Sequence, residues 1–203
     1  MKTILQLNAS MLSDNGQSSR LANELVTALR QEEPAAKLIL RDLARDPVPH
    51  LDADRFGAFI ARPEARTLKQ DAFVAYSDGL IGELKQADVI VLGLPMYNFG
   101  VPSTLKAYFD HIARAGVTFQ YTATGPVGLL AGKKLYVFAT RGGIYAGTPR
   151  DTQTAYVRDF LAFLGIADVE FVYAEGLAIS ETSRNAALTK ARYQIERMVP
   201  AYA

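Results

Sequence analysis

Short apolar runs alternate along this chain with longer segments that have the apolar spacing of helices. Five such runs occur, at residues 3–7, 37–43, 89–94, 135–139 and 169–174. This alternation is typical of βαβ units, in which helices connect parallel strands. The third and fourth runs are almost continuously apolar, which indicates strands buried on both faces of a sheet. We therefore predict an α/β fold with a doubly wound, five-stranded parallel sheet in the order 2-1-3-4-5 and helices on both faces.

The connecting segments carry helical periodicity. Leu21, Leu25 and Leu29 line one face of a first predicted helix. The other predicted helices centre on residues 73–84, 105–113, 156–164 and 180–198. Two segments exceed an ordinary connection: residues 44–66, interpreted as a lid or an arm to a partner subunit, and residues 118–126, interpreted as a hairpin. Neither has the size of a separate domain, so all 203 residues are predicted to form one domain.

Composition and charge argue against several kinds of partner. The formal net charge is +1 and no segment concentrates lysine and arginine, so no nucleic-acid partner is predicted. Cysteine is absent, and His50 and His111 lie far apart in the sequence, so no metal site is predicted. No run reaches the roughly 18–20 apolar residues that span a bilayer, and the N-terminus lacks an export signal. We therefore expect a cytoplasmic protein without membrane contact.

Three polar loops follow the first, third and fourth apolar runs. They are residues 10–18, 96–99 and 140–143. In the predicted strand order these three strands are neighbours. In open α/β sheets, ligands bind beyond the carboxyl ends of the strands, at the point where the strand order reverses. We therefore predict that the three loops form one binding site.

The first loop ends where the first helix begins, a position that favours anions. Free backbone N–H groups and the positive end of the helix dipole suit a phosphate, and Ser10 and Ser18 add hydroxyl donors. The simpler alternative is that Ser18 or Ser19 only caps the helix. A dinucleotide fingerprint requires G-x-G-x-x-G, whereas this loop contains only Gly16. The loop therefore favours a mononucleotide.

The second and third loops suit a flat ring system. Met96 and Tyr97 offer polarizable or flat surface, and Asn98, expected to be buried, can donate and accept along the polar edge of a heterocycle. Gly142 and Gly143 allow the backbone to approach a ligand closely. For the second loop the alternative is that these side chains pack in the core, and for the third loop it is that the glycines only form a turn. The predicted placement of all three loops at one edge of the sheet favours a ligand site.

Three motifs point to one known family. They are Pro-Met-Tyr-Asn-Phe at 95–99, Arg-Gly-Gly at 141–143 and Arg-Ala-Gly-Val-Thr-Phe at 114–119. On these motifs the whole chain resembles the FMN-dependent NAD(P)H:quinone oxidoreductases of the azoreductase type, a flavodoxin-like family. The resemblance implies that the FMN phosphate is held by Ser10, Gly16, Gln17 and Ser18. It implies that the isoalloxazine is held by Met96, Tyr97, Asn98, Phe99, Thr140, Arg141, Gly142 and Gly143.

Two positions differ from the pattern of the resembled family. Its members often have serine where this chain has Gly16, and also where it has Thr140. Thr140 keeps a hydroxyl group. Gly16 has none, so it would have to bind through its backbone.

The resemblance further implies a homodimer with two sites at the subunit interface and a substrate pocket over the flavin. The candidate pocket residues are Asn98, Tyr121 and Phe163. For the two aromatic side chains, ordinary hydrophobic packing is the alternative. Arg55, Arg62 and Arg66 are candidates for contact with the phosphates of the nicotinamide cofactor, with solvated surface charge as the alternative.

The implied reaction transfers two electrons from NADH or NADPH to quinones or azo compounds by a ping-pong mechanism. The flavin would carry the hydride, so no catalytic side chain is predicted. One alternative is a non-enzymatic flavodoxin-type electron carrier, a class that tends to be strongly acidic, whereas this chain is near neutral. Another is a serine hydrolase, because residues 103–106 match S-x-x-K and residues 13–15 match S-D-N. However, K-T-G is missing and the order is reversed.

Overall fold

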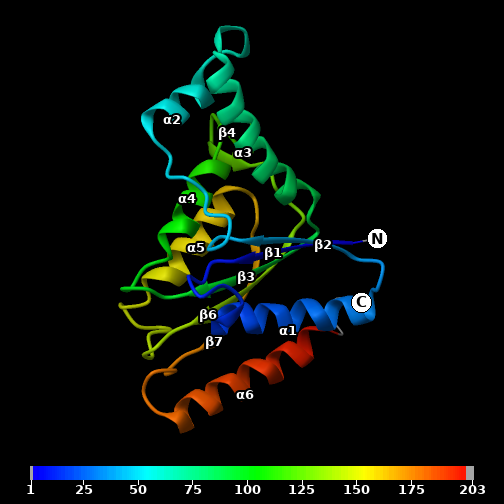
Figure 1. The fold of residues 1–203 in the computed structure, drawn as a ribbon, viewed down its shortest axis with the longest axis vertical. Helices are drawn as coiled ribbons and strands as arrows, with labels where there is room; N and C mark the ends of the chain where they lie inside the picture. The colour runs from blue at the N-terminus through cyan, green and yellow to red at the C-terminus, as the bar shows by residue number, and fades with distance from the viewer. Residues whose placement is uncertain (1, 200–203) are drawn as a thin grey trace.

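The five apolar runs form one parallel sheet in the computed structural model, which describes residues 2–199 (Figure 1). The strands are β1 (Thr3–Asn8), β2 (Lys37–Asp42), β3 (Val89–Pro95), β6 (Lys134–Thr140) and β7 (Asp168–Ala174). They lie in the order β2-β1-β3-β6-β7. This order corresponds to the predicted 2-1-3-4-5, because β4 and β5 belong to a separate hairpin. The strand order and the parallel sheet are therefore confirmed.

Helices cover both faces of this sheet (Figure 1). One face carries α1 (Gln17–Glu32) and α6 (Glu181–Met198), and the other carries α3 (Leu68–Gln86), α4 (Ser103–Ile112) and α5 (Thr152–Phe163). Successive strand side chains point to opposite faces, so Ile4 packs in the cluster under α1 and α6 whereas Leu5 packs in the other. No helix within residues 2–199 has the length and apolar character needed to cross a membrane.

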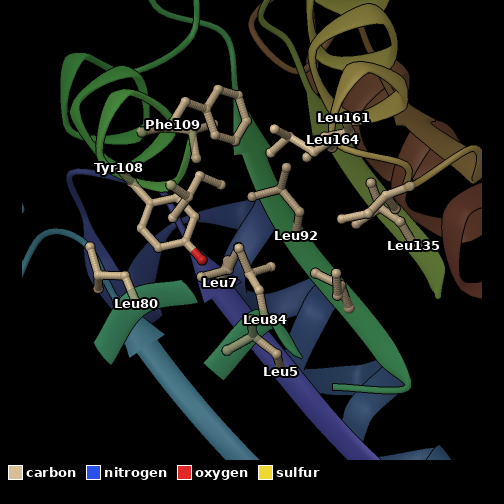
Figure 2. Packing of buried hydrophobic residues seen from close by; sticks show 14 of the residues in the cluster. Leu5, Leu7, Leu80, Leu84, Leu92, Tyr108, Phe109, Leu135, Leu161 and Leu164 are labelled. Atoms are coloured by element: carbon tan, nitrogen blue, oxygen red, sulfur yellow. The ribbon is translucent and has the colours of Figure 1, made fainter. Parts of the chain in front are cut away.

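The larger hydrophobic cluster lies between the sheet and α3, α4 and α5. Figure 2 shows strand residues such as Leu7 and Leu92 facing Tyr108 and Phe109 of α4. Every residue of β3 is buried, which explains its almost continuously apolar sequence. The two clusters hold the sheet between its helical layers, and the parallel ladders set the register in which the strands end.

The 44–66 segment contains α2 (Ala53–Ile60) and a short 3₁₀ helix, η2 (Pro63–Ala65), which periodicity did not predict. The segment is anchored by His111 at the end of α4. The His111 Nε2 atom lies 3.0 Å from the Pro49 carbonyl oxygen, and the imidazole makes edge-on contacts with Phe59 and Tyr76. Burial lowers the pKa of His111, so the ring is neutral at pH 7. The segment therefore packs on its own subunit through α3 and α4.

The predicted hairpin is present as β4 (Phe119–Thr122) and β5 (Gly125–Gly128), which pair antiparallel. Its far end rests on the carboxyl end of α5, where the Leu130 N–H donates to the Leu164 carbonyl at 2.9 Å. Gly165 has a φ of 99°, a left-handed conformation that suits glycine after a helix. A Cβ atom on Gly128 would overlap the backbone of Gly165. The hairpin thus approaches α5 backbone to backbone.

Candidate functional site

Hydrogen bonds join the three predicted loops at the carboxyl edge of the sheet. The Tyr97 hydroxyl lies 3.3 Å from Ser10 Oγ, and the Met11 N–H donates to it at 3.3 Å. The Met96 N–H donates to the Thr140 carbonyl at 3.0 Å. The second loop therefore contacts both of the others, and the prediction that the three loops lie together is confirmed.

The first loop is held in shape from the end of β2. It contains the 3₁₀ helix η1 (Ser13–Asn15), and Ser13 has a left-handed φ of 51°. The Asp42 carboxylate, which is almost fully buried, accepts from the Ser13 hydroxyl and from the backbone of the following loop. A Cβ atom on Gly16 would overlap the Ser10 side chain. Glycine at position 16 therefore leaves space for Ser10.

The start of α1 presents unsatisfied hydrogen-bond donors. The first N–H groups of a helix have no intrahelical partner, and Gly16 at the N-cap has no side chain to accept from them. The Ser18 and Ser19 hydroxyls are buried and have no hydrogen-bond partner within residues 2–199. Neither serine caps the helix, because both lie inside its first turn. This arrangement fits a bound phosphate, which would supply the missing acceptors.

Glycine in β3 allows α1 to approach the sheet. A Cβ atom on Gly93 would lie 3.1 Å from the backbone carbon and oxygen of Ser18. Real Cβ contacts are rarely so short, so any larger residue would push the start of α1 away from the sheet. Sequence reasoning missed Gly93, although a glycine inside an apolar strand is a signal for close backbone approach.

The second loop has an unusual backbone. Asn98 and Phe99 adopt left-handed φ values of 49° and 63°. Left-handed conformations cost non-glycine residues about 1–2 kcal/mol each, and they persist where the surroundings fix them. Asn98 is exposed at the tip of the turn, not buried as its sequence context predicts, because the reversal at 97–100 directs it outward. Its amide is therefore accessible to a ligand.

The third loop is fixed by a buried ion-pair network. The guanidinium of Arg141 is fully buried, 2.6 Å from the Asp151 carboxylate and 3.1 Å from that of Glu175. Glu175 also accepts from the Tyr145 N–H at 2.8 Å and from the Ala146 N–H at 2.9 Å. The side chain of Arg141 thus serves the interior of the fold. Gly142, by contrast, is exposed at the edge of the sheet.

The two acidic partners of Arg141 are not predicted by any sequence pattern. Burial acts to raise the pKa of Asp151, but hydrogen bonds from Arg141 and Thr154 outweigh burial and lower this pKa below its usual value. The Asp151 carboxylate is therefore ionised at neutral pH and the ion pair is intact. Asp151 precedes α5 and Glu175 follows β7, so no short motif joins them to Arg141.

Tyr121 and Phe163 lie together, but away from the three loops. Phe119 contacts both: its ring centroid lies 5.5 Å from that of Tyr121 and 4.3 Å from that of Phe163. The start of α5 contacts the second loop, because the Thr152 hydroxyl donates to the Phe99 carbonyl. Phe163 follows Thr152 by eleven helical steps, which is roughly 16 Å along the helix axis. Within one chain, the structure does not bring these aromatic side chains to the loops.

A cleft of about 500 Å³ opens beside the first and second loops. Its lining includes Met11, Tyr97 and Asn98, together with Ala44 and Pro47 from the start of the 44–66 segment. A larger cavity of about 1020 Å³ lies at the opposite edge of the sheet, near Lys2 and Lys134. Cavity volume alone therefore does not identify the binding site in this protein. The unsatisfied donors and the accessible Asn98 amide favour the carboxyl edge.

The arginines of the 44–66 segment have different surroundings. Arg55 lies over the ring of Phe73, 4.3 Å from its centroid, and pairs with Asp52, so it serves the packing of α2 on α3. Arg62 is exposed. The Nε atom of Arg66 is buried and has no hydrogen-bond partner within the described residues. Contact with a nicotinamide cofactor stays a prediction for these arginines.

A family model described as the flavodoxin-like fold matches residues 2–199. The FMN-dependent NADH:quinone oxidoreductase of Cellvibrio japonicus is 53% identical over 201 residues, which cover 99% of this chain and 100% of that protein. FMN-dependent NADH:quinone oxidoreductase 6 of Burkholderia lata is 55% identical over 195 residues, or 96% and 98% of the two chains.

Among solved structures, an FMN-dependent NADH-azoreductase from Bacillus anthracis str. Ames Ancestor, in complex with FMN, superposes with a TM-score of 0.87. It is 26% identical, and the match covers 98% of this chain and 100% of that one. The resemblance that the three motifs predict is thus confirmed over almost the full length. The chain belongs to the family with the flavodoxin-like fold.

Proposed function

We propose that this chain is an FMN-dependent NADH:quinone oxidoreductase that also reduces azo compounds. The observation that carries the proposal is the joining of three loops into one site with unsatisfied donors at its phosphate end. The relatives named as FMN-dependent NADH:quinone oxidoreductases and the FMN-bound azoreductase support the same cofactor and reaction. We further propose that all 203 residues form a single FMN-binding domain built on a doubly wound sheet, and that the protein is cytoplasmic.

In this proposal the residues of the first loop and of the α1 start hold the FMN phosphate. They are Ser10, Gly16, Gln17 and Ser18, with backbone N–H groups providing most donors because Gly16 has no hydroxyl. The second and third loops hold the isoalloxazine through residues 96–99 and 140–143. The Arg141 side chain takes part only by holding the third loop in place, since it is fully buried. Asn98 is exposed and is proposed to meet the ring edge or the substrate.

The chain's own residues bind and orient the reactants. Bound FMN would supply two-electron chemistry, accepting a hydride from NADH and reducing the quinone or azo compound. Donor and acceptor would use the same pocket in turn, which gives a ping-pong mechanism that requires no protein nucleophile. The N–H groups of Gly142 and Gly143 lie in a loop whose shape is fixed beforehand, so they can stabilise negative charge on the ring system.

We propose that the substrate pocket is completed by a second copy of the chain. Tyr121 is 75% exposed, and it lies with Phe163 at the far end of α5 from the loops of its own subunit. In a homodimer with two sites at the interface, these aromatic side chains would face the flavin of the partner. An exposed tyrosine beside a half-buried phenylalanine suits a flat ring from either subunit.

Sedimentation velocity should give twice the monomer mass for the wild-type protein. The variant Phe163→Ala should raise the KM for a quinone several-fold while leaving the FMN content unchanged, because the substitution removes a pocket wall and no FMN contact. A monomeric active enzyme, or a loss of FMN in the variant, would contradict this part of the proposal.

The spectrum of the purified protein tests the cofactor and the reaction together. We expect the absorbance bands of oxidised flavin, bleached by NADH without oxygen, and steady NADH oxidation when a quinone is added. A flavin protein without NADH–quinone turnover would favour the alternative of an electron carrier. A colourless protein that does not take up added FMN would overturn the proposal.

The variant Ser18→Ala, which removes the Ser18 hydroxyl, should weaken FMN binding by about 10- to 100-fold. A hydrogen bond to a charged group contributes roughly 1.5–3 kcal/mol. The Kd of the FMN-free protein can be measured by the quenching of flavin fluorescence. Ser77→Ala is the matched control, because the Ser77 hydroxyl is also buried but donates to the His111 carbonyl. The proposed role of Ser18 is wrong if both variants bind FMN equally well.

A further inference from the structure

The first turn of α5 contacts the strained second loop at three carbonyl oxygens. The Thr152 hydroxyl donates to the Phe99 carbonyl. The Gln153 Nε2 atom donates to the carbonyls of Pro95 and Gly100, each at 2.9 Å. The Gln153 side chain is completely buried. These bonds bracket the two left-handed residues of the loop, so the reversal is held at both of its ends.

The same turn contacts the third loop. The Asp151 carboxylate pairs with Arg141 at 2.6 Å, and the Thr154 hydroxyl accepts from Arg141 at 3.1 Å. Asp151 is also the N-cap of α5, because its carboxylate accepts from the Thr154 N–H at 3.1 Å. Residues 151–154 thus form one hydrogen-bonded turn that contacts the second loop on one side and the third loop on the other.

We infer that this first turn of α5 is a clamp that fixes the second and third loops relative to each other, with Gln153 and Asp151 as positioning residues for the isoalloxazine ring. The inference rests on the proposed function for the identity of the ligand, but the clamp itself follows from the contacts of the protein. Neither residue needs to touch the ligand. Each acts through a loop that does, because a loop ordered before binding loses little freedom when the ligand arrives.

The clamp predicts that FMN affinity depends on Gln153 beyond any effect on overall stability. The variant Gln153→Met keeps the length of the side chain and removes both donors, so we expect FMN binding about tenfold weaker. Val157→Ala is the matched control. Val157 is buried one turn further along α5 and its apolar side chain cannot hydrogen-bond to either loop, so its loss should lower the melting temperature while leaving the FMN Kd within about twofold.

A double variant tests whether the two loops share one support. Asp151→Asn keeps an N-cap side chain but removes the charge that faces Arg141. If residues 151–154 act as a unit, the combined Gln153→Met and Asp151→Asn variant should weaken FMN binding by less than the product of the two single effects. Strictly multiplicative effects would overturn the clamp. So would an equal loss of affinity in Val157→Ala at a matched loss of melting temperature.

Hydrogen exchange of the FMN-free protein separates the clamp from the proposed cofactor. We expect Gln153→Met to accelerate exchange of backbone amides in residues 97–100 and also in residues 141–146, and Val157→Ala to leave both regions close to wild type. If wild-type protein does not bind FMN, the proposed function fails, while accelerated exchange in both loops still supports the clamp. Unchanged exchange in either loop of Gln153→Met overturns it.

Discussion

Replacing Arg141 with methionine should lower the free energy of unfolding by about 3–5 kcal/mol. The guanidinium is fully buried between Asp151 and Glu175, so the variant leaves two nearly buried carboxylates without their cation. Methionine fills much of the volume but offers no donor. The Arg141→Met protein should also bind FMN more weakly, since the third loop loses its internal support. Urea unfolding and FMN titration measure the two effects.

An exposed ion pair provides the control for this substitution. Arg192 pairs with Glu24 on the surface between α6 and α1, where the Arg192 side chain is 51% exposed. Arg192→Met removes the same chemical group but should cost at most about 1 kcal/mol, because exposed pairs are well solvated when separated. If Arg141→Met loses no more stability than Arg192→Met, the network at the third loop is not a determinant of the fold.

Replacing Gly128 with alanine should be nearly as damaging. The added Cβ atom would overlap the backbone at Leu164 and Gly165. Backbone atoms cannot move away by a rotamer change as the end of a flexible side chain can. Overpacking costs about 1–3 kcal/mol, and the backbone neighbour places this case at about 3 kcal/mol, or roughly 6–12 °C in melting temperature. The hairpin that bears Tyr121 must also move, so quinone turnover should fall more than FMN binding.

A glycine-to-alanine substitution on an exposed helix face should not lower the melting temperature. Gly79 lies on the exposed side of α3, and a Cβ atom added to it would meet nothing within 4 Å in the described residues beyond its chain neighbours and its own helix backbone. Gly79→Ala should therefore keep or raise the melting temperature, because alanine favours the helix by about 0.5–1 kcal/mol. A Gly128→Ala protein as stable as Gly79→Ala would show that the hairpin can slide on α5 without cost.

The sheet and the place of the loops could be predicted from sequence because each depends on a local pattern. Apolar runs such as 89–94 mark strands buried on both faces, and strand order then follows from the limited ways in which βαβ units connect. The hairpin at 118–126 was also predictable, from its length and its glycine and proline residues. In contrast, α2 was missed although its eight residues are amphipathic. It is short, and it lies in a segment whose prolines at positions 47, 49 and 63 indicate a loop.

The supports of the site were not predictable in the same way. Gln153, Asp151 and Glu175 act on carbonyls, amides and a guanidinium from distant segments, and such contacts leave no spacing in the sequence. Asn98 was identified from its residue type, but its exposure could not be predicted. Its residue type suggested a ring-facing amide, but its exposure depends on a backbone reversal that Gln153 and Thr152 hold from outside the loop. The roles of the predicted contact residues toward FMN stay predictions.

The separation of Tyr121 and Phe163 from the three loops has a consequence for how such an enzyme can change. Cofactor retention would be governed by the strand ends and the start of α5, whereas acceptor choice would be governed by a hairpin that contacts the opposite end of α5. Substitutions at Tyr121, which is largely exposed, can then diversify the range of reducible compounds without loosening the prosthetic group. At Tyr121, acceptor range can therefore evolve, or be engineered, separately from cofactor retention, whereas at Asn98 the two properties are linked.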